Sequence, residues 1–482
     1  MNVVSLHRHG FVVAAVLAVL STYSMPSWAI ETGAVVNGAA LSPLWIVPFA
    51  GILLSIAFMP VTAPAFWHHH FGKTTAFWSL AFIVPFAVQF GPAFTAQEVM
   101  HTLVSEYIPF VILLFALFTV AGGIHIGGAL RGTAARNTGL LAIGTLLASV
   151  MGTTGASMLL IRPLLSANDN RRHRAHVVVF FIFLVANIGG ALTPLGDPPL
   201  FLGFLKGVSF FWTTKAMVWP TLMAAAILLA LFYAVDRWLW RRDIADGLIV
   251  PDPTPDRPLT ITGTINVALL FAIVGVVLIS GVWKPDLEVR LFGTSVEAQN
   301  AFRDVMLVFI TFASLRLTPR APRAANQFSF QPMIEVAILF AGIFLTIIPA
   351  LAILRAGHEG VLAPVLALLT TSGGEALDAR YFLLTGLLSS VLDNAPTYLV
   401  FFSLAGGDPV QLMGPMASTL TAISAGAVFM GANTYIGNAP NFMVKAVAES
   451  RGVRMPSFFE YLGWSLLVLG PIYLLLTLLF FS

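Results

Sequence analysis

The sequence predicts an all-α polytopic membrane protein with two inverted structural repeats, each containing a re-entrant hairpin and a broken transmembrane helix. Three observations lead to this prediction. Of the 482 residues, 58% are hydrophobic and 10% are charged, whereas a soluble protein has about 25% charged residues. Many apolar runs approach the roughly 20 residues that cross a bilayer. Four of them are interrupted by polar, Gly-rich or Pro-rich segments, two in each half of the chain.

The composition also excludes several classes of protein. Cysteine is absent, which removes disulfides, thiolate catalysis and Cys-type metal sites. There is no H-E-x-x-H, G-x-S-x-G or P-loop pattern, and no polar segment is long enough for a soluble catalytic domain. We therefore expect no enzyme. The net charge of +3 is too small to indicate nucleic-acid binding, so the lipid bilayer is the expected partner.

The amino terminus resembles a secretory signal. A short basic segment precedes an apolar run over 11–20, and Ala29 is the small residue that a signal peptidase prefers. We predict a signal peptide over 1–29, with an uncleaved first helix as the alternative. The mature chain would then begin outside a bacterial-type inner membrane.

The first repeat is predicted over residues 44–235. The histidines at 68–70 point in different directions on a helix, so we assign 65–75 to an interfacial loop rather than a metal site. The elements expected in this repeat are helices at 44–61, 76–90 and 101–124, a hairpin at 138–165, a broken helix formed by 176–190 and 199–212, and a helix at 214–235.

The hairpin at 138–165 is polar at its centre, where the chain reads G-T-T-G-A-S. Arginines flank it on both sides. Since basic residues stay in the cytoplasm, both ends of the segment should lie inside and the chain should enter and return. The flanking arginines are Arg131 and Arg136 before the hairpin, and Arg162, Arg171, Arg172 and Arg174 after it.

The broken helix that follows contains A-N-I-G-G-A-L-T-P-L-G-D-P-P over 186–199. In lipid, freed backbone groups and a carboxylate such as Asp197 both need partners, so this interruption indicates a functional site.

A basic segment with four prolines, 236–261, is predicted as a cytoplasmic linker, and the second repeat covers 262–482. Its second hairpin lacks the flanking arginines of the first, except Arg380, and should enter from the opposite side. This inversion is typical of secondary transporters with discontinuous helices around a midplane site. The expected elements are helices at 262–283, 305–317 and 332–354, a hairpin at 381–404, a helix at 414–447 broken at 433–441, and a helix at 461–481.

The four interruptions offer oxygen ligands and half-helix ends, which suit a hard cation such as Na⁺. Asp197 and Asp393 are the sharpest candidates, because a carboxylate in a dry site can hold a proton or a cation in turn. The alternative is that each Asp caps a half-helix. The candidate binding residues are Thr153, Thr154, Ser157, Asn187, Thr193, Asp197, Asp393, Asn394, Thr397, Asn433, Thr434, Asn438 and Asn441. Among them, the candidate Na⁺ ligands are Thr154, Asp197, Asp393, Asn394 and Asn438.

Two further carboxylates, Glu106 and Glu335, lie near the ends of predicted helices. An interfacial role and a proton relay are equally open for them.

The motifs N-I-G-G-A-L-T-P-L-G-D-P-P, L-D-N-A-P-T and G-N-A-P-N-F resemble those of the ion transporter superfamily. The first two resemble NhaD-type sodium/proton antiporters, and the whole chain resembles a CitMHS-like branch described as citrate transporters or sodium:proton antiporters. The resemblance implies an inverted-repeat transporter that is usually a homodimer and works by an elevator motion. It implies no cofactor, with Na⁺ and H⁺ as transported or coupling ions.

The substrate could be a small inorganic cation or a small organic anion. Pro198 and Pro199 stand where NhaD-type proteins have hydroxyl residues, which removes possible Na⁺ ligands and weakens the resemblance to that type. Dicarboxylate carriers typically show Ser-Asn-Thr at both hairpin tips, which this chain lacks. Two Asp carboxylates would repel an organic anion unless cations neutralised them. We therefore expect cation/proton antiport first, and Na⁺- or H⁺-coupled transport of citrate or a dicarboxylate as the alternative. A channel is disfavoured because paired hairpins indicate alternating access.

Overall fold

The computed structural model describes residues 36–128, 131–247, 260–371 and 373–482. The predicted signal peptide at 1–29 lies outside these residues, as do residues 248–259 of the predicted linker. Residues Asn37–Ser482 form one compact unit.

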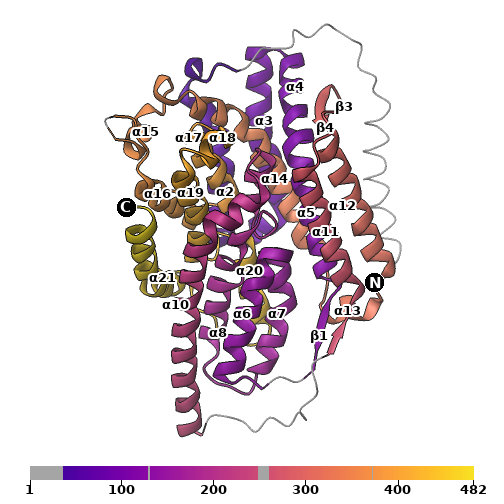
Figure 1. The fold of residues 1–482 in the computed structure, drawn as a ribbon, viewed down its shortest axis with the longest axis vertical. Helices are drawn as coiled ribbons and strands as arrows, with labels where there is room; N and C mark the ends of the chain where they lie inside the picture. The colour runs from indigo at the N-terminus through magenta and orange to yellow at the C-terminus, as the bar shows by residue number, and fades with distance from the viewer. Residues whose placement is uncertain (1–35, 129–130, 248–259, 372) are drawn as a thin grey trace. The chain divides into compact units, whose positions relative to one another are not determined.

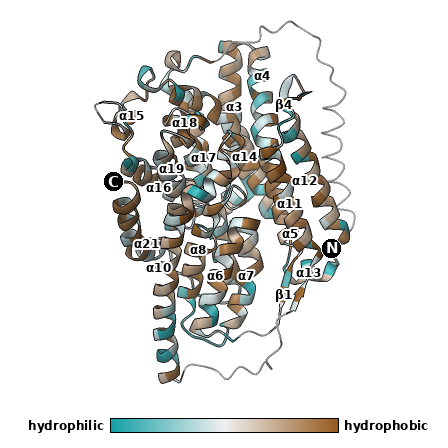
Figure 2. Cartoon of the chain, viewed as in Figure 1, coloured by the Kyte–Doolittle hydropathy of each residue, from teal (hydrophilic) through white to brown (hydrophobic). Residues whose placement is uncertain are grey.

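Helices dominate the described residues, and nine of them are long and apolar enough to cross a membrane, which confirms the all-α polytopic class. Figure 2 shows hydrophobic residues along helices such as α21 and hydrophilic ones toward the carboxyl end of α10. The nine candidate spans are Pro43–Thr62, Pro64–Phe90, Pro92–Ala121, Ala134–Met151, Ala175–Leu192, Phe210–Ala245, Ile265–Val282, Gln331–Arg355 and Phe458–Phe480.

The first half is helical almost throughout (Figure 1). Its elements are η1 (Gly38–Ala40), η2 (Pro43–Ile46), α2 (Val47–Thr62), α3 (Pro64–Phe90), α4 (Pro92–Thr102), η3 (Leu103–Tyr107), α5 (Ile108–Ala121), β1 (His125–Gly127), α6 (Ala134–Met151), α7 (Thr153–Ala167), α8 (Ala175–Leu184), η4 (Ile188–Leu192), α9 (Pro198–Leu205) and α10 (Phe210–Ala245).

The second half follows a similar order, with a short hairpin of strands added near its start. Its elements are β2 (Thr260–Thr262), α11 (Ile265–Val282), β3 (Glu288–Leu291), β4 (Thr294–Glu297), α12 (Ala298–Leu317), α13 (Arg320–Ala325), α14 (Gln331–Arg355), η5 (Gly357–Glu359), α15 (Ala363–Leu369), α16 (Asp378–Val391), α17 (Asn394–Leu404), α18 (Pro409–Met413), α19 (Ala417–Met430), η6 (Gly431–Asn433), α20 (Ala439–Ser450) and α21 (Phe458–Phe480).

All four predicted interruptions are present. Helices α6 and α7 lie side by side and are separated only by Gly152, and α16 and α17 form the second hairpin (Figure 1). The broken helices are α8–η4–α9 and α19–η6–α20. Helix α8 is buried at every residue after Ala175, so the first broken helix lies in the core rather than against lipid. Irregular backbone at membrane depth is tolerated in such a buried place.

The loop predicted at 65–75 is wrong, because these residues belong to helix α3. Pro64 occupies its first turn, where a missing N–H costs nothing. The ring Nδ1 of His69 lies 2.8 Å from the carbonyl oxygen of Ala65, one helical turn back. The histidines are therefore accommodated on the helix surface without breaking it.

Helix α10 continues to Ala245, so residue 236, where the linker was predicted to begin, lies inside a helix. The reason is tertiary: Asp236 and Asp243 are buried and lie 2.6 Å and 3.9 Å from the Arg171 guanidinium. Burying a guanidinium with two carboxylates requires ordered backbone on both sides.

Two pairs of short antiparallel strands were not predicted. Strand β1 pairs with β2, with His125 opposite Thr262, and joins the end of α5 to the start of α11. Strand β3 pairs with β4 between α11 and α12. Three- and four-residue strands carry too little sequence pattern to be recognised.

Candidate functional site

Asp197 lies at the centre of the four interruptions, and it is 2% exposed. Its Oδ1 accepts hydrogen bonds from the Thr153 hydroxyl at 2.9 Å and from Asn438 Nδ2 at 3.1 Å. Its Oδ2 accepts one from Asn394 Nδ2 at 2.5 Å. These donors come from the first hairpin, the second broken helix and the second hairpin. One carboxylate therefore joins all four segments.

Four half-helices begin around this carboxylate. Gly152, Asp197, Asp393 and Asn438 precede α7, α9, α17 and α20, respectively. The first residues of α7 and α17, Thr153 and Asn394, donate to Asp197. Because a helix amino terminus carries a partial positive charge and unpaired N–H groups, the site favours negative charge at its centre.

Local sequence explains how the chain can approach itself so closely here. Gly152 has φ +80°, a conformation that a side chain disfavours. A Cβ on Gly196 would lie 2.1 Å from the carbonyl oxygen of Gly190. Prolines at the first positions of α9 and α20 start those helices without losing a hydrogen bond. The glycines and prolines thus bring two backbone segments into contact beside Asp197.

Each broken helix is attached to the hairpin of its own half by an equivalent hydrogen bond. The Thr193 hydroxyl donates to the Ser149 carbonyl oxygen at 2.5 Å, and the Thr434 hydroxyl donates to that of Ser390 at 2.6 Å. Both bonds span 44 residues of sequence. Thr193 lies four residues before Asp197, and Thr434 lies four residues before Asn438. Asp197 and Asn438 are the residues that precede the half-helices α9 and α20. Asp197 and Asn438 are 241 residues apart.

Three asparagines extend the site away from Asp197. Asn438 Nδ2 lies 3.2 Å from Asn187 Oδ1, and Asn187 Nδ2 donates to Asn441 Oδ1 at 2.7 Å. Asn441 Nδ2 in turn donates to the carbonyl oxygens of Gly431 and Thr434, both at 2.8 Å. The side chains of the two broken helices therefore fix each other directly.

Asp393 behaves as a capping residue. Its Oδ1 accepts the backbone N–H of Ala395 at 3.0 Å, which caps helix α17. It also lines the cavity next to Asp197. Asn394 beside it has a buried Oδ1 without a hydrogen-bond partner among the described residues. A buried amide oxygen of this kind is costly unless it meets a ligand.

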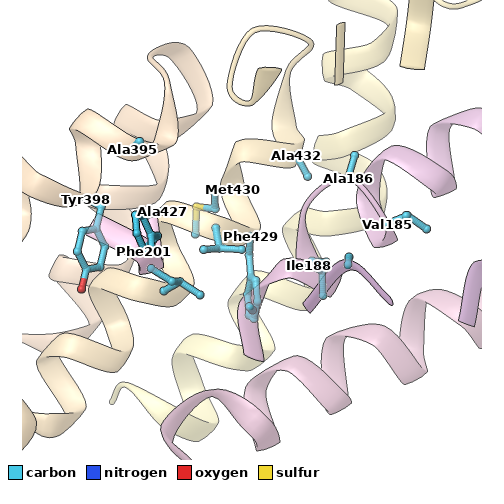
Figure 3. Close-up of a cluster of buried hydrophobic side chains, with 14 of the residues drawn as sticks. Val185, Ala186, Ile188, Phe201, Ala395, Tyr398, Ala427, Phe429, Met430 and Ala432 are labelled. Atoms are coloured by element: carbon cyan, nitrogen blue, oxygen red, sulfur yellow. The ribbon is translucent and has the colours of Figure 1, made fainter. Parts of the chain in front are cut away.

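The cavity at this centre has a volume of about 50 Å³. Its polar wall consists of Thr153, Thr154, Asp197, Asp393 and Asn438, and none of its described lining residues is Lys, Arg or His. The opposite wall is apolar and comes from α5 and α14. Figure 3 shows the apolar side chains packed on the interruptions, with Phe201 on α9, Tyr398 on α17 and Met430 on α19. Asp197 is thus buried beside apolar side chains, whereas Asp393 is partly exposed.

Eight of the predicted site residues meet at this centre, namely Thr153, Thr154, Asn187, Asp197, Asp393, Asn394, Asn438 and Asn441. The remaining five have other surroundings. Thr193 and Thr434 bond to hairpin backbone, Asn433 Nδ2 donates to Ser390 Oγ at 2.8 Å, Thr397 bonds to the Asp393 carbonyl oxygen, and Ser157 is buried outside the cavity lining.

The two glutamates lie away from this centre. Glu106 pairs with Lys206 at 2.5 Å, which links η3 to the end of α9. Glu335 is near Gln331 on the surface of α14. Ser149 and Ser390 were not predicted. The only sequence signal that could have identified them is their equivalent position, shortly before each hairpin tip.

Comparison with known proteins agrees with this architecture. The profile of a family described as "Putative citrate transport" matches residues 38–481. The chain is also 25% identical over 339 residues to the uncharacterized transporter Rv2684 of Mycobacterium tuberculosis and to the uncharacterized transporter Mb2703 of Mycobacterium bovis. Each match covers 69% of this chain and 73% of the relative.

Since the family profile covers nearly all the described residues and these contain nine helices fit to span a bilayer, the chain belongs to this citrate transport family and is a multi-pass membrane transporter.

Proposed function

We propose that the protein is a secondary active transporter that exchanges a small cation for protons at Asp197 and Asp393. Na⁺ is the first candidate for this cation. The observation that carries the proposal is a small cavity lined by two carboxylates, the buried Asp197 and the partly exposed Asp393, with no basic residue among its described lining residues. An isolated charge in a dry interior costs far more than a paired one. Each carboxylate would therefore bind a proton or a cation, and exchange between the two is antiport.

The ligand set supports a hard cation. Asp197 accepts three hydrogen bonds, which leaves about one of the roughly four lone-pair sites of its carboxylate for a cation. The Asn394 Oδ1, the Thr154 hydroxyl and the free oxygen of Asp393 would supply further ligands. Oxygen atoms of this kind are preferred by Na⁺ and similar ions. Na⁺ and H⁺ are the transported or coupling ions here, and the proposal requires no cofactor.

We infer that the two halves, 44–235 and 262–482, are inverted repeats joined after α10. The matching hydrogen bonds of Thr193 and Thr434 and the equal order of hairpin and broken helix support the repeat. The basic residues around the first hairpin support cytoplasmic ends for it. The proposal includes an inner membrane of bacterial type, a mature amino terminus outside and a homodimer.

A second candidate is cation-coupled transport of citrate or a dicarboxylate. It is favoured by the four half-helix amino termini around Asp197, because they would attract a substrate carboxylate once cations neutralise the two aspartates. The description of the matching family agrees with this alternative.

Transport in proteoliposomes separates the two candidates. An internal pH dye would report proton movement after addition of Na⁺ or Li⁺, and labelled citrate or succinate would report anion uptake. Antiport predicts proton movement in response to the cation without any organic anion. Citrate accumulation without cation-driven proton movement would refute it and support the alternative. Asp393→Asn should abolish coupling if its carboxylate carries the exchanged ion, whereas wild-type activity would leave Asp393 as a cap only.

A further inference from the structure

A second cavity lies apart from the Asp197 site and has a volume of about 460 Å³. It is enclosed by the end of α2, the second interruption, α20 and the start of α21. We refer to it as the α2–α21 pocket. The proposed cation exchange at Asp197 makes no use of it.

The α2–α21 pocket lies at a membrane boundary. The candidate span containing α2 ends at Thr62, and that of α21 begins at Phe458. Two apolar residues of the pocket, Val61 and Phe442, are 52% and 54% exposed. In a membrane protein such exposed apolar side chains face lipid. Arg451 and Arg454 assign this boundary to the cytoplasmic side by the positive-inside rule.

The pocket carries two charges of each sign. Lys445 and Arg454 are basic, and Glu449 and Glu460 are acidic. Lys445 Nζ lies 2.9 Å from Glu449 Oε1 and 5.3 Å from the centre of the Tyr435 ring. Glu460 Oε2 accepts the backbone N–H of Ser457 at 2.7 Å as part of a capping box. A ligand that complements this lining carries both a negative and a positive group.

We propose that the α2–α21 pocket binds a phospholipid whose headgroup contains a phosphate and a primary ammonium, as in phosphatidylethanolamine. Arg454 and Lys445 hold the phosphate, and Glu449 and Glu460 accept N–H bonds from the ammonium. The acyl chains leave the pocket across Val61 and Phe442 into the bilayer. A choline headgroup has no N–H donor for the carboxylates, and a purely anionic headgroup would supply no positive group to Glu449 and Glu460.

The bound lipid would stabilise the second interruption. Tyr435 and Ile436 line the pocket and belong to the segment between η6 and α20. The Tyr435 hydroxyl donates to the carbonyl oxygen of Pro456 at 3.0 Å, so the interruption is already attached to the segment before α21. A headgroup on Lys445 and Arg454 would add contacts to both sides of this attachment.

The test measures lipid retention, which requires no knowledge of the transported substrate. The purified full chain is reconstituted with equal amounts of phosphatidylethanolamine and phosphatidylcholine, extracted in mild detergent, and examined by native mass spectrometry. Wild type should retain phosphatidylethanolamine preferentially. Arg454→Gln and Glu449→Gln should each reduce that preference about tenfold, because each removes one charge-assisted contact. Arg320→Gln, an exposed arginine on α13 outside the pocket lining, should leave it unchanged.

Four results would overturn the proposal. One is equal retention of both lipids by the wild type, and another is an unchanged preference in both pocket variants. The third comes from a parallel reconstitution with equal amounts of phosphatidylethanolamine and phosphatidylglycerol: preferential retention of phosphatidylglycerol with no effect of Glu449→Gln would indicate a purely anionic ligand. Size-exclusion elution and melting temperature of each variant report folding. A shift from dimer to monomer in Arg454→Gln with unchanged lipid retention would assign the pocket to a second copy of the chain.

Discussion

Replacing Asp197 by Asn tests the proposed site most directly. Asn has nearly the same shape and can keep the bonds from Thr153 and Asn438 at its Oδ1, but its Nδ2 would face Asn394 Nδ2 where the two side chains now lie 2.5 Å apart. Asn394 can relieve this clash by turning its amide, because its Oδ1 has no partner in the described structure. The stability cost should therefore stay within the roughly 1–3 kcal/mol of one lost hydrogen bond.

The transport effect of Asp197→Asn should be much larger. Loss of one charged ligand to a cation, worth about 1.5–3 kcal/mol, corresponds to a roughly 10- to 100-fold weaker half-saturation for Na⁺. In addition, Asn cannot exchange a proton at neutral pH, so Na⁺-driven proton movement should disappear. The pH-dye assay in proteoliposomes measures both quantities, and thermal unfolding checks the fold.

Asn438 provides a matched companion for this test, because it bonds to Asp197 at 3.1 Å from the corresponding position of the second broken helix. The double variant Asp197→Asn/Asn438→Asp keeps one carboxylate at the centre and should recover part of the coupling. If Asp197→Asn alone retained wild-type half-saturation and proton movement, Asp197 would be a structural cap and the proposed chemistry would be wrong.

Two further predictions concern packing around the site. Gly196→Ala should abolish transport or prevent folding, because its Cβ would lie 2.1 Å from the Gly190 carbonyl oxygen. The control Gly463→Ala on α21 has open space around it and should leave both transport and folding unchanged. The detergent-solubilised yield measures folding, and the dye assay measures transport. Asp236→Asn removes a carboxylate 2.6 Å from the buried Arg171 and should lower the free energy of unfolding by about 3–5 kcal/mol, seen as a lower melting temperature. An unchanged melting temperature would contradict the second prediction.

Prediction of helices from the sequence succeeded where the signal is local. The four interruptions were located because Gly, Pro and Asp inside an apolar run are visible without any partner. The ends of helices were less certain. Helix α10 passes through the basic residues after Val235 because Arg171, far away in sequence, compensates Asp236 and Asp243. Three consecutive histidines suggested a loop, although their imidazoles are easily placed on the surface of α3.

Eight of the predicted site residues lie together in the structure, and their roles stay a prediction. Asp197 was a candidate from its place in a broken helix, and it is the carboxylate on which three segments converge. Asp393 was an equally sharp candidate with capping as the alternative, and its visible contact is a cap on α17. Thr193 and Thr434 looked like ligands because they are polar residues within interruptions. Their hydroxyls instead attach each broken helix to its hairpin.

The sequence by itself determined the membrane class, the two-part order of elements and the four polar interruptions, because hydropathy and backbone breaks depend on neighbouring residues. Only the tertiary structure decided that the second hairpin and the second broken helix donate to Asp197, since Asn394 and Asn438 are 197 and 241 residues away from it along the chain. That convergence depends on how half-helices pack around the glycines of the interruptions. Packing of this kind is a property of the folded chain and leaves no periodic pattern in any one segment.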